Sequence, residues 1–180
     1  MLRLSEFFHG LDIHSLQTGR PVGQLIEPII NPDNLAIPAW HCQRFGEPGL
    51  LILHSDDIRE VGQPGVIIDN EERMMTTEDL VRLQAILDLK FDLVGKKVVT
   101  ANGQRVGRVS DYVINEQTWL VQKLHVSQSP WRNVSMGNRI IDRAQIVEVT
   151  PKKIIVRNTE VKAGKTAHVI AFNPLSQGPA

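Results

Sequence analysis

Two glycines four residues apart, Gly103 and Gly107, lie in the stretch NGQRVGRVSDYVIN (residues 102–115) together with Arg105 and Arg108. Glycines beside basic residues can hold a phosphate where the loop opens a helix. This stretch lacks the Lys-Ser/Thr pair of a nucleotide-binding P-loop. Its apolar and polar residues alternate, which predicts a strand and not a helix. We therefore interpret the glycine stretch as a tight turn between two strands, with Asn-Gly suited to a two-residue type I′ hairpin.

The other residues that could support catalysis form no recognised pattern. The chain has six histidines, and none belongs to a metal-ligand spacing. Cys42 follows His41 directly, but neighbours on a strand point to opposite faces, so they make a poor nucleophile and base pair. We expect no catalytic residue, no metal site, no cofactor and no enzymatic activity.

The glycine stretch has a counterpart earlier in the chain. Shifted by 84 positions, residues 18–41 align without a gap on residues 102–125, and shifted by 88, residues 50–68 align on residues 138–156. The matched positions that define the motif are Gly19 with Gly103, Gly23 with Gly107, and Glu27 with Asp111. Two carboxylates at equivalent positions indicate a shared structural hydrogen bond, for instance to the glycine-turn backbone, and not a catalytic role. The chain therefore contains two copies of one unit of about 70 residues.

Each copy is predicted to contain five or six short strands. Such a strongly twisted sheet can bury its apolar face by curling into a small barrel. Between the copies, residues 76–90 are predicted to form a helix, because Thr76 or Thr77 can cap it and Leu80, Leu83, Ile86 and Leu87 share one face. We thus predict a first unit at residues 1–75, a connecting helix at 76–90, a second unit at 91–163 and a tail at 164–180. The tail contains an apolar HVIAF stretch that we expect to dock across a barrel or to fray.

The motif resembles that of the PRC-barrel family. The residues that carry it are Val106, Gly107, Val109, Asp111, Val113, Ile114 and Asn115, and in the first copy Val22, Gly23, Leu25, Glu27, Ile29, Ile30 and Asn31. The resemblance implies a mainly β fold of two small PRC-type β-barrels in tandem, joined by one α-helix. It also implies an assembly or docking role, as in the cytoplasmic domain of the photosynthetic reaction centre H subunit and the C-terminal domain of the bacterial ribosome maturation factor. In the first copy, Pro28 and Pro32 interrupt the expected strand.

Composition narrows the class of protein. One cysteine excludes an internal disulfide and favours a reducing compartment, and no apolar run reaches the roughly 18 residues of a membrane-spanning helix, so we expect a cytoplasmic protein. The zero net charge conceals opposite halves. Residues 1–90 carry 7 Lys/Arg and 14 Asp/Glu, a net charge of −7, whereas residues 91–180 carry 13 and 6, a net charge of +7. Such halves can attract a charged partner or another copy of the chain.

These observations predict a macromolecule-binding protein. A protein-docking module, against a ribosomal or membrane-complex subunit as the resemblance implies, is the first hypothesis. The predicted contact residues are Trp131, Arg132, Arg105, Arg108, Lys123 and Arg139. The alternative hypothesis is RNA binding by the basic second unit, with Trp119 or Trp131 stacking on a base. A ligand pocket or hydrolase site between the units has no residue signature.

Overall fold

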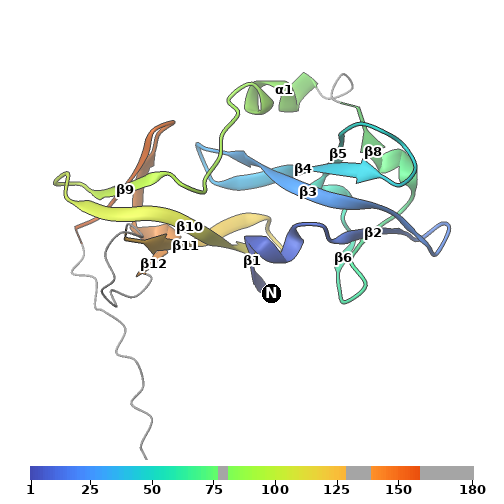
Figure 1. Ribbon diagram of the computed structural model, residues 1–180, viewed down its shortest axis with the longest axis horizontal. Helices are drawn as coiled ribbons and strands as arrows, with labels where there is room; N and C mark the ends of the chain where they lie inside the picture. Colours follow the sequence, from blue (N-terminus) through green and yellow to red (C-terminus); the bar gives the residue numbers. More distant parts are fainter. Residues whose placement is uncertain (77–80, 129–138, 159–180) are drawn as a thin grey trace, which may run out of the picture.

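The computed structural model describes residues 1–76, 81–128 and 139–158 of the chain. Most of its strands follow one another in a single sheet, in the order β13-β14-β9-β10-β11-β4-β3-β2-β7-β6 (Figure 1). β1, β5, β8 and β12 attach to the sides of this path. The prediction of a mainly β protein is confirmed.

The first half contains β1 to β8 and the second half β9 to β14. The strands of the first half are β1 (Leu2–Leu4), β2 (Asp12–Ser15), β3 (Pro21–Asn31), β4 (Ala36–Arg44), β5 (Leu51–His54), β6 (Glu60–Val61), β7 (Val66–Ile68) and β8 (Met74–Met75). Those of the second half are β9 (Lys97–Thr100), β10 (Arg105–Asn115), β11 (Leu120–Ser127), β12 (Arg139–Asp142), β13 (Ile146–Val149) and β14 (Lys153–Val156). The helical segments are the 3-10 turns η1 (Ser5–Phe8), η2 (Ser55–Asp57), η3 (Glu71–Arg73) and η5 (Arg143–Gln145), and the helix α1 (Val81–Leu87).

The strands pair in the same way in both halves. In the first half, β2, β3, β4 and β5 are successive antiparallel neighbours, β7 lies parallel to β2, and β6 pairs with β7. In the second half, β9, β10, β11 and β12 are successive antiparallel neighbours, β14 lies parallel to β9, and β13 pairs with β14. A β-bulge also recurs at Leu25/Glu27 and at Val109/Asp111, 84 positions apart.

The halves meet where β4 pairs with β11. The Ile37 amide donates to the Trp119 carbonyl at 2.7 Å, and the Val121 amide donates to the Leu35 carbonyl at 3.0 Å. Leu35 and Trp119 both have positive φ, 52° and 50°, which is uncommon outside glycine. Leu35 and Trp119 are 84 positions apart, and so are Ile37 and Val121. The junction is therefore a reciprocal contact with approximate two-fold symmetry.

The architecture differs from the predicted one. The sequence predicts two separate closed barrels, but the sheet is not closed, and in the described residues its path ends at β6 and β13. The two halves are instead joined into one sheet by a short pairing of β4 with β11, in which Ala36 lies opposite Leu120.

Close packing of two strands requires a glycine in each half. A Cβ atom on Gly23 would lie 2.4 Å from the Gln43 carbonyl oxygen, and one on Gly107 would lie 2.4 Å from the Ser127 carbonyl oxygen. Gln43 and Ser127 are again 84 positions apart. The preceding turn differs from the predicted type I′ hairpin, because in Asn102-Gly103 only Gly103 has positive φ, at 80°. The Gly103 amide donates to the Thr100 carbonyl, which closes a longer loop.

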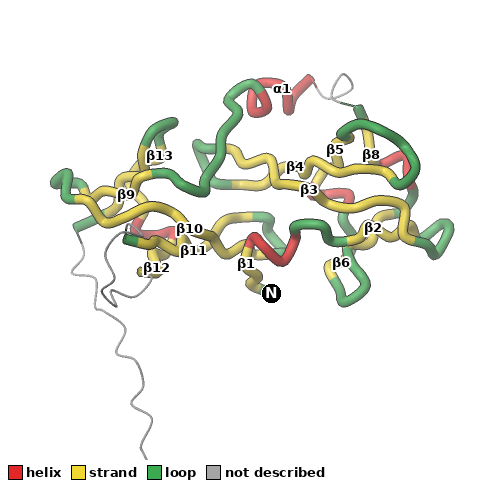
Figure 2. The backbone as a smooth tube through the Cα atoms, in the orientation of Figure 1, coloured by secondary structure: helices red, strands yellow, loops and turns green. Residues whose placement is uncertain are grey.

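Each half receives a segment from the other end of the chain's connection: the N-terminal strand β1 pairs with the second half, and α1, which leads into the second half, packs on the first. β1 adds an edge strand to β10, with Leu2 opposite Asn115 and Leu4 opposite Val113 (Figure 2). α1, which lies at the end of the connection from the first half, packs against β3 on the side shown at the top of Figure 1. The predicted helix at 76–90 is thus observed over Val81–Leu87, and residues 77–80 lie outside the described residues.

Proline does not interrupt the long strand of the first half. β3 continues through Pro28 to Asn31, and Pro28 lies opposite Trp40 of β4. The prediction of an interruption at Pro28 is therefore wrong. β2 pairs with β3 only as far as Gln24, so the edge of β3 that faces away from β4 is unpaired at Pro28. A proline is tolerated at such an edge because no ladder hydrogen bond is lost there. Pro32 follows the end of the strand.

One apolar core extends across both halves. Its centre is an aromatic cluster in which the ring centroids of Phe8 and Trp40 lie 5.0 Å apart and those of Trp40 and Trp119 lie 5.7 Å apart. Trp119 is only 8% exposed. Its predicted role of stacking on an RNA base is therefore wrong, because the ring is part of the core.

Candidate functional site

The side of the sheet that faces away from the core differs between the halves. In the first half it carries Ile29 and Ala39 opposite one another, with His54 next to Ala39, and Glu27, His41 and Ile52 in the adjacent row. We call these six residues the covered face. Leu83, Ile86 and Leu87 of α1 pack against its apolar members, and Met75 of β8 completes the cluster. Ile52 is consequently 1% exposed.

The equivalent residues of the second half lie in the same two rows. One row contains Val113, Lys123 and Asp142, and the other contains Asp111, His125 and Ile140. We call these residues the open face. Ile140, the counterpart of Ile52, is 52% exposed. No helix among the described residues packs on this face as α1 does on the first.

The second half of the chain, which carries the open face, matches a known family. The family model of the PRC-barrel domain matches residues 90–163. We refer to these matched residues as the PRC-barrel domain. The resemblance inferred from the glycine motif is thereby confirmed for the second half, and the open face is a surface of the PRC-barrel domain. No curated protein matches the chain significantly.

The structure separates the predicted contact residues of the PRC-barrel domain. Lys123 is on the open face and lies 3.6 Å from Asp142, in an ion pair. Arg139 is opposite Val126, in register with the core side of β11. Arg105 and Arg108 are exposed on β10, and Arg108 donates to the Gly95 carbonyl at 2.8 Å. Trp131 and Arg132 lie outside the described residues.

Asp111 and Glu27 differ in their hydrogen bonds although they occupy equivalent positions. The Asp111 carboxylate accepts from the Tyr112 amide at 2.7 Å and from the Ser5 hydroxyl. These donors are not those of the glycine turn. The Glu27 side chain makes no hydrogen bond with the described residues, and Pro28, the counterpart of Tyr112, has no amide hydrogen to donate. The predicted hydrogen bond is therefore not shared by the two copies: in the described residues, only the Asp111 carboxylate forms a side-chain hydrogen bond.

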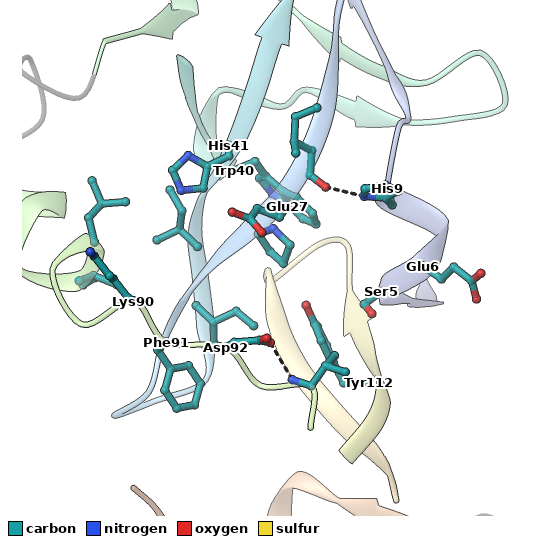
Figure 3. Close-up of a pocket in the computed structure, with 17 residues that line it drawn as sticks. Ser5, Glu6, His9, Glu27, Trp40, His41, Lys90, Phe91, Asp92 and Tyr112 are labelled. Atoms are coloured by element: carbon teal, nitrogen blue, oxygen red, sulfur yellow. Dashed lines mark hydrogen bonds between the residues drawn. The ribbon is translucent and has the colours of Figure 1, made fainter. Parts of the chain in front are cut away.

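Glu27 instead lines a cleft of about 600 Å³ (Figure 3). The N-terminal segment, β3, β4, α1, the connection to β9 and β10 supply its walls. Its polar residues are Ser5, Glu6, His9, Glu27, His41, Lys90, Asp92 and Tyr112. In Figure 3 Glu27 lies between His41 and Tyr112, with Lys90 on the opposite wall. His9 is held by its Nδ1 contact with the Ile26 carbonyl at 2.8 Å.

Burial shifts the pKa of Tyr112, which lines the cleft, and of Cys42, which lies outside it. Burial raises the pKa of the Tyr112 phenol, which also hydrogen-bonds Ser5, so the phenol stays protonated at neutral pH. Burial likewise raises the pKa of the Cys42 thiol to about 12, and the thiol is therefore not a nucleophile at neutral pH. Within the described residues no three His, Cys, Asp or Glu side chains converge as a metal site would require.

Buried polar atoms at the floor of the cleft do not add a ligand site. Trp40 Nε1 and His41 Nδ1 lack hydrogen-bond partners in the described part of the chain. Both atoms are out of contact with solvent, so a molecule in the cleft does not reach them without rearrangement. The cleft can hold a polar side chain of a partner against Glu27 and Lys90.

Sequence reasoning missed a row of cations. Arg108 of β10 lies opposite Lys97 of β9, and Lys97 lies opposite Lys153 of β14. All three are exposed. The row joins residues from three segments far apart in the sequence, and only the strand register brings them together.

Among helices of the described residues, none is long and apolar enough to cross a membrane.

Proposed function

We propose that the chain is a non-enzymatic protein-docking module, and that the PRC-barrel domain binds its partner through the open face. The contrast between Ile52 and Ile140 carries this proposal. One position is sealed by α1 at 1% exposure, and its counterpart is 52% exposed on an otherwise equivalent surface. Because about half of the Ile140 side chain is exposed, covering it contributes about 1 kcal/mol, and the open face gains stability when a partner covers it.

The open face also has polar groups that can set specificity. Lys123 and Asp142 form an exposed ion pair, and His125 lies between Asp111 and Ile140 in the neighbouring row. Exposed pairs contribute little to stability, so their groups can exchange partners at low cost. The face thus combines the apolar residues Val113 and Ile140 with polar groups, and protein interfaces likewise combine both kinds of residue.

We further propose that residues 1–75 are a diverged copy of the PRC-barrel unit and that residues 76–90 connect the two units. The equivalent strand pairing, the Gly23 and Gly107 contacts and the reciprocal bonds at Leu35 and Trp119 support this proposal. In this interpretation the first unit has lost its docking face to α1, and the second has kept it.

The partner class is also a proposal. The PRC-barrel resemblance favours a subunit of a ribosomal or membrane complex, in the cytoplasm. The opposite charges of the halves favour self-association as an additional contact. RNA binding is the weaker proposal, because Trp119 is buried and Arg143, a residue of the basic half, donates to the carbonyls of Val121 and Asn34.

Capture from a cell lysate on the immobilised full-length chain tests the docking face. Ile140→Asp should abolish recovery of a specific protein, because a charge on the open face would have to be buried. Val147→Asp is the matched control, since Val147 is 58% exposed on β13. Trp131→Ala, in the same capture, tests the predicted contact at that residue.

Two results would contradict the proposal. The first is recovery of no specific protein by the unsubstituted chain. The second is recovery of the same protein, in the same amount, by the Ile140→Asp chain. Loss of capture by both Ile140→Asp and Val147→Asp would also count against the open face as the specific site. Sedimentation at several concentrations measures self-association separately.

A further inference from the structure

The cation row of Arg108, Lys97 and Lys153 crosses three neighbouring strands. Directly opposite residues of a sheet point to the same side, and neighbouring strands lie about 4.8 Å apart. The three cations therefore form a line about 10 Å long. The row lies on the side of the sheet that faces away from the core, as the open face does, because Val98 and Val109 next to it are buried.

The row is unbalanced within the described residues. None of its three members forms an ion pair there, and Arg108 has only the Gly95 carbonyl as a hydrogen-bond acceptor. Like charges placed directly opposite one another destabilise a sheet. A ligand with negative charges relieves this repulsion, whereas solvent only screens it.

The equivalent position of the first half has the reverse character. Asp12 of β2 lies opposite Gln24 of β3, and the neighbouring Gly65 packs against the Asp12 carbonyl. Asp12 and Gln24 are the counterparts of Lys97 and Arg108. The cation row is therefore specific to the PRC-barrel domain and is not a requirement of the strand arrangement.

Two apolar residues adjoin the cations on the same side of the sheet. Val99 lies opposite Arg105 and Ile155, and Ile155 lies opposite Glu148. Both apolar residues are half-buried. A ligand that lies across these strands therefore meets the cation row and a second row with an apolar centre and the charged ends Arg105 and Glu148.

We propose that this surface binds an acidic amphipathic helix of the partner protein, an inference that rests on the proposed docking function. Residues three or four apart on a helix are about 5–6 Å from one another, which matches the spacing of cations on adjacent strands. Carboxylates at such positions pair with Arg108, Lys97 and Lys153, and apolar residues beside them cover Val99 and Ile155. α1 on the covered face is an example in this chain of a helix packed on the outer side of the sheet.

A nucleic acid is the other polyanion that the row could bind. Single strands are usually held by exposed aromatic rings as well as by cations. Among the described residues of the PRC-barrel domain, Tyr112 and Trp119 are buried, and Phe91 is covered by the Lys96 ammonium at 4.4 Å from the ring centroid. The surface therefore favours carboxylates over a nucleic acid.

Binding of a labelled synthetic peptide to the full-length chain tests the inference. The peptide consists of repeats of Glu-Leu-Ala-Glu-Glu-Leu-Ala, and its control has Gln at every Glu. We expect the acidic peptide to bind and its affinity to fall with added salt, and the Gln peptide not to bind. Lys97→Glu should weaken binding about tenfold, since it removes one ion pair and adds a repulsion. Lys153→Glu should act similarly. Arg20→Glu, an equal charge change at an exposed turn of the first half, should have no effect.

The outcomes separate this inference from the docking function. Equal binding by the unsubstituted and Lys97→Glu chains would overturn the inference. Binding of polyuridylate, weakened by Lys97→Glu, without binding of the peptide would overturn it in favour of a nucleic acid. If lysate capture depends on Ile140 but not on Lys97, docking holds and the acidic helix is excluded. If the peptide binds as expected but no lysate protein is captured, the acidic site holds and the docking function fails.

Discussion

The two halves of this chain share a strand arrangement and differ in what covers it. Ile52 and Ile140 occupy equivalent positions, yet Ile52 is buried and Ile140 is exposed. Asp12 and Lys97 are also equivalent, yet one is acidic and the other is basic. The positions that agree are those where backbones meet, such as Gly23 and Gly107. The comparison teaches that contacts between backbones define the unit, and that its outer side is free to acquire a helix or a partner.

The strongest test of the equivalence is substitution of the paired glycines. Gly23→Ala and Gly107→Ala should each lower the free energy of unfolding by about 4 kcal/mol, because the new Cβ atom meets a backbone oxygen that cannot move aside. Urea denaturation measures this loss. Gly62→Ala is the control, since its Cβ would lie at an ordinary 3.6 Å from Pro64. Tolerance of alanine at only one of the two positions would break the equivalence.

Truncation of the paired isoleucines sharpens the difference between the faces. Ile52→Ala should cost about 3 kcal/mol, because it leaves a cavity beneath α1. Ile140→Ala should change stability by less than about 0.5 kcal/mol, as expected at an exposed site. Thermal unfolding of the two variants provides the comparison. Similar losses at the two positions would mean that the open face is covered in solution.

The segments that precede each half provide a smaller test. Ser5, in the N-terminal segment, forms hydrogen bonds with Asp111 and Tyr112. Lys90, in the segment that leads into the second half, lines the cleft. Ser5→Ala should cost about 1 kcal/mol, and Lys90→Ala should stay within about 0.5 kcal/mol. Hydrogen exchange of the amides of β1 should accelerate in the first variant only. Unchanged exchange in Ser5→Ala would show that this contact does not hold the N-terminal segment.

Much of this fold could be predicted from the sequence, because its local signals are strong. The glycine turns and the alternating residues predicted a mainly β chain of short strands, and the helix was expected from its apolar spacing. Pairing of β4 with β11 was not predictable, since it depends on positive φ at Leu35 and Trp119, residues that seldom adopt it. The cation row was missed for a similar reason. Arg108, Lys97 and Lys153 are adjacent only through strand register.

The smallest expected effect concerns pH. The hydrogen bonds from Arg59, at 2.9 and 2.7 Å, hold the pKa of the Asp69 carboxyl below its usual value. Its contribution to stability is therefore present above the ordinary pKa of an aspartate and is lost as pH falls through the lowered folded value. NMR titration should show the Asp69 pKa rise in Arg59→Gln. The counterparts in the second half, Val147 and Arg157, cannot form this pair. An unchanged Asp69 pKa would remove Arg59 as its cause.

The central claim is that equivalent faces are covered in one half and open in the other. The most direct measurement is the rate at which a thiol reagent labels Ile52→Cys and Ile140→Cys in the folded chain. Cys42 gives little background, because it is fully buried and burial raises its pKa to about 12. We predict that Ile140→Cys reacts nearly as fast as an unfolded peptide thiol and that Ile52→Cys reacts only as fast as the chain unfolds. Equal protection of the two thiols would contradict the account.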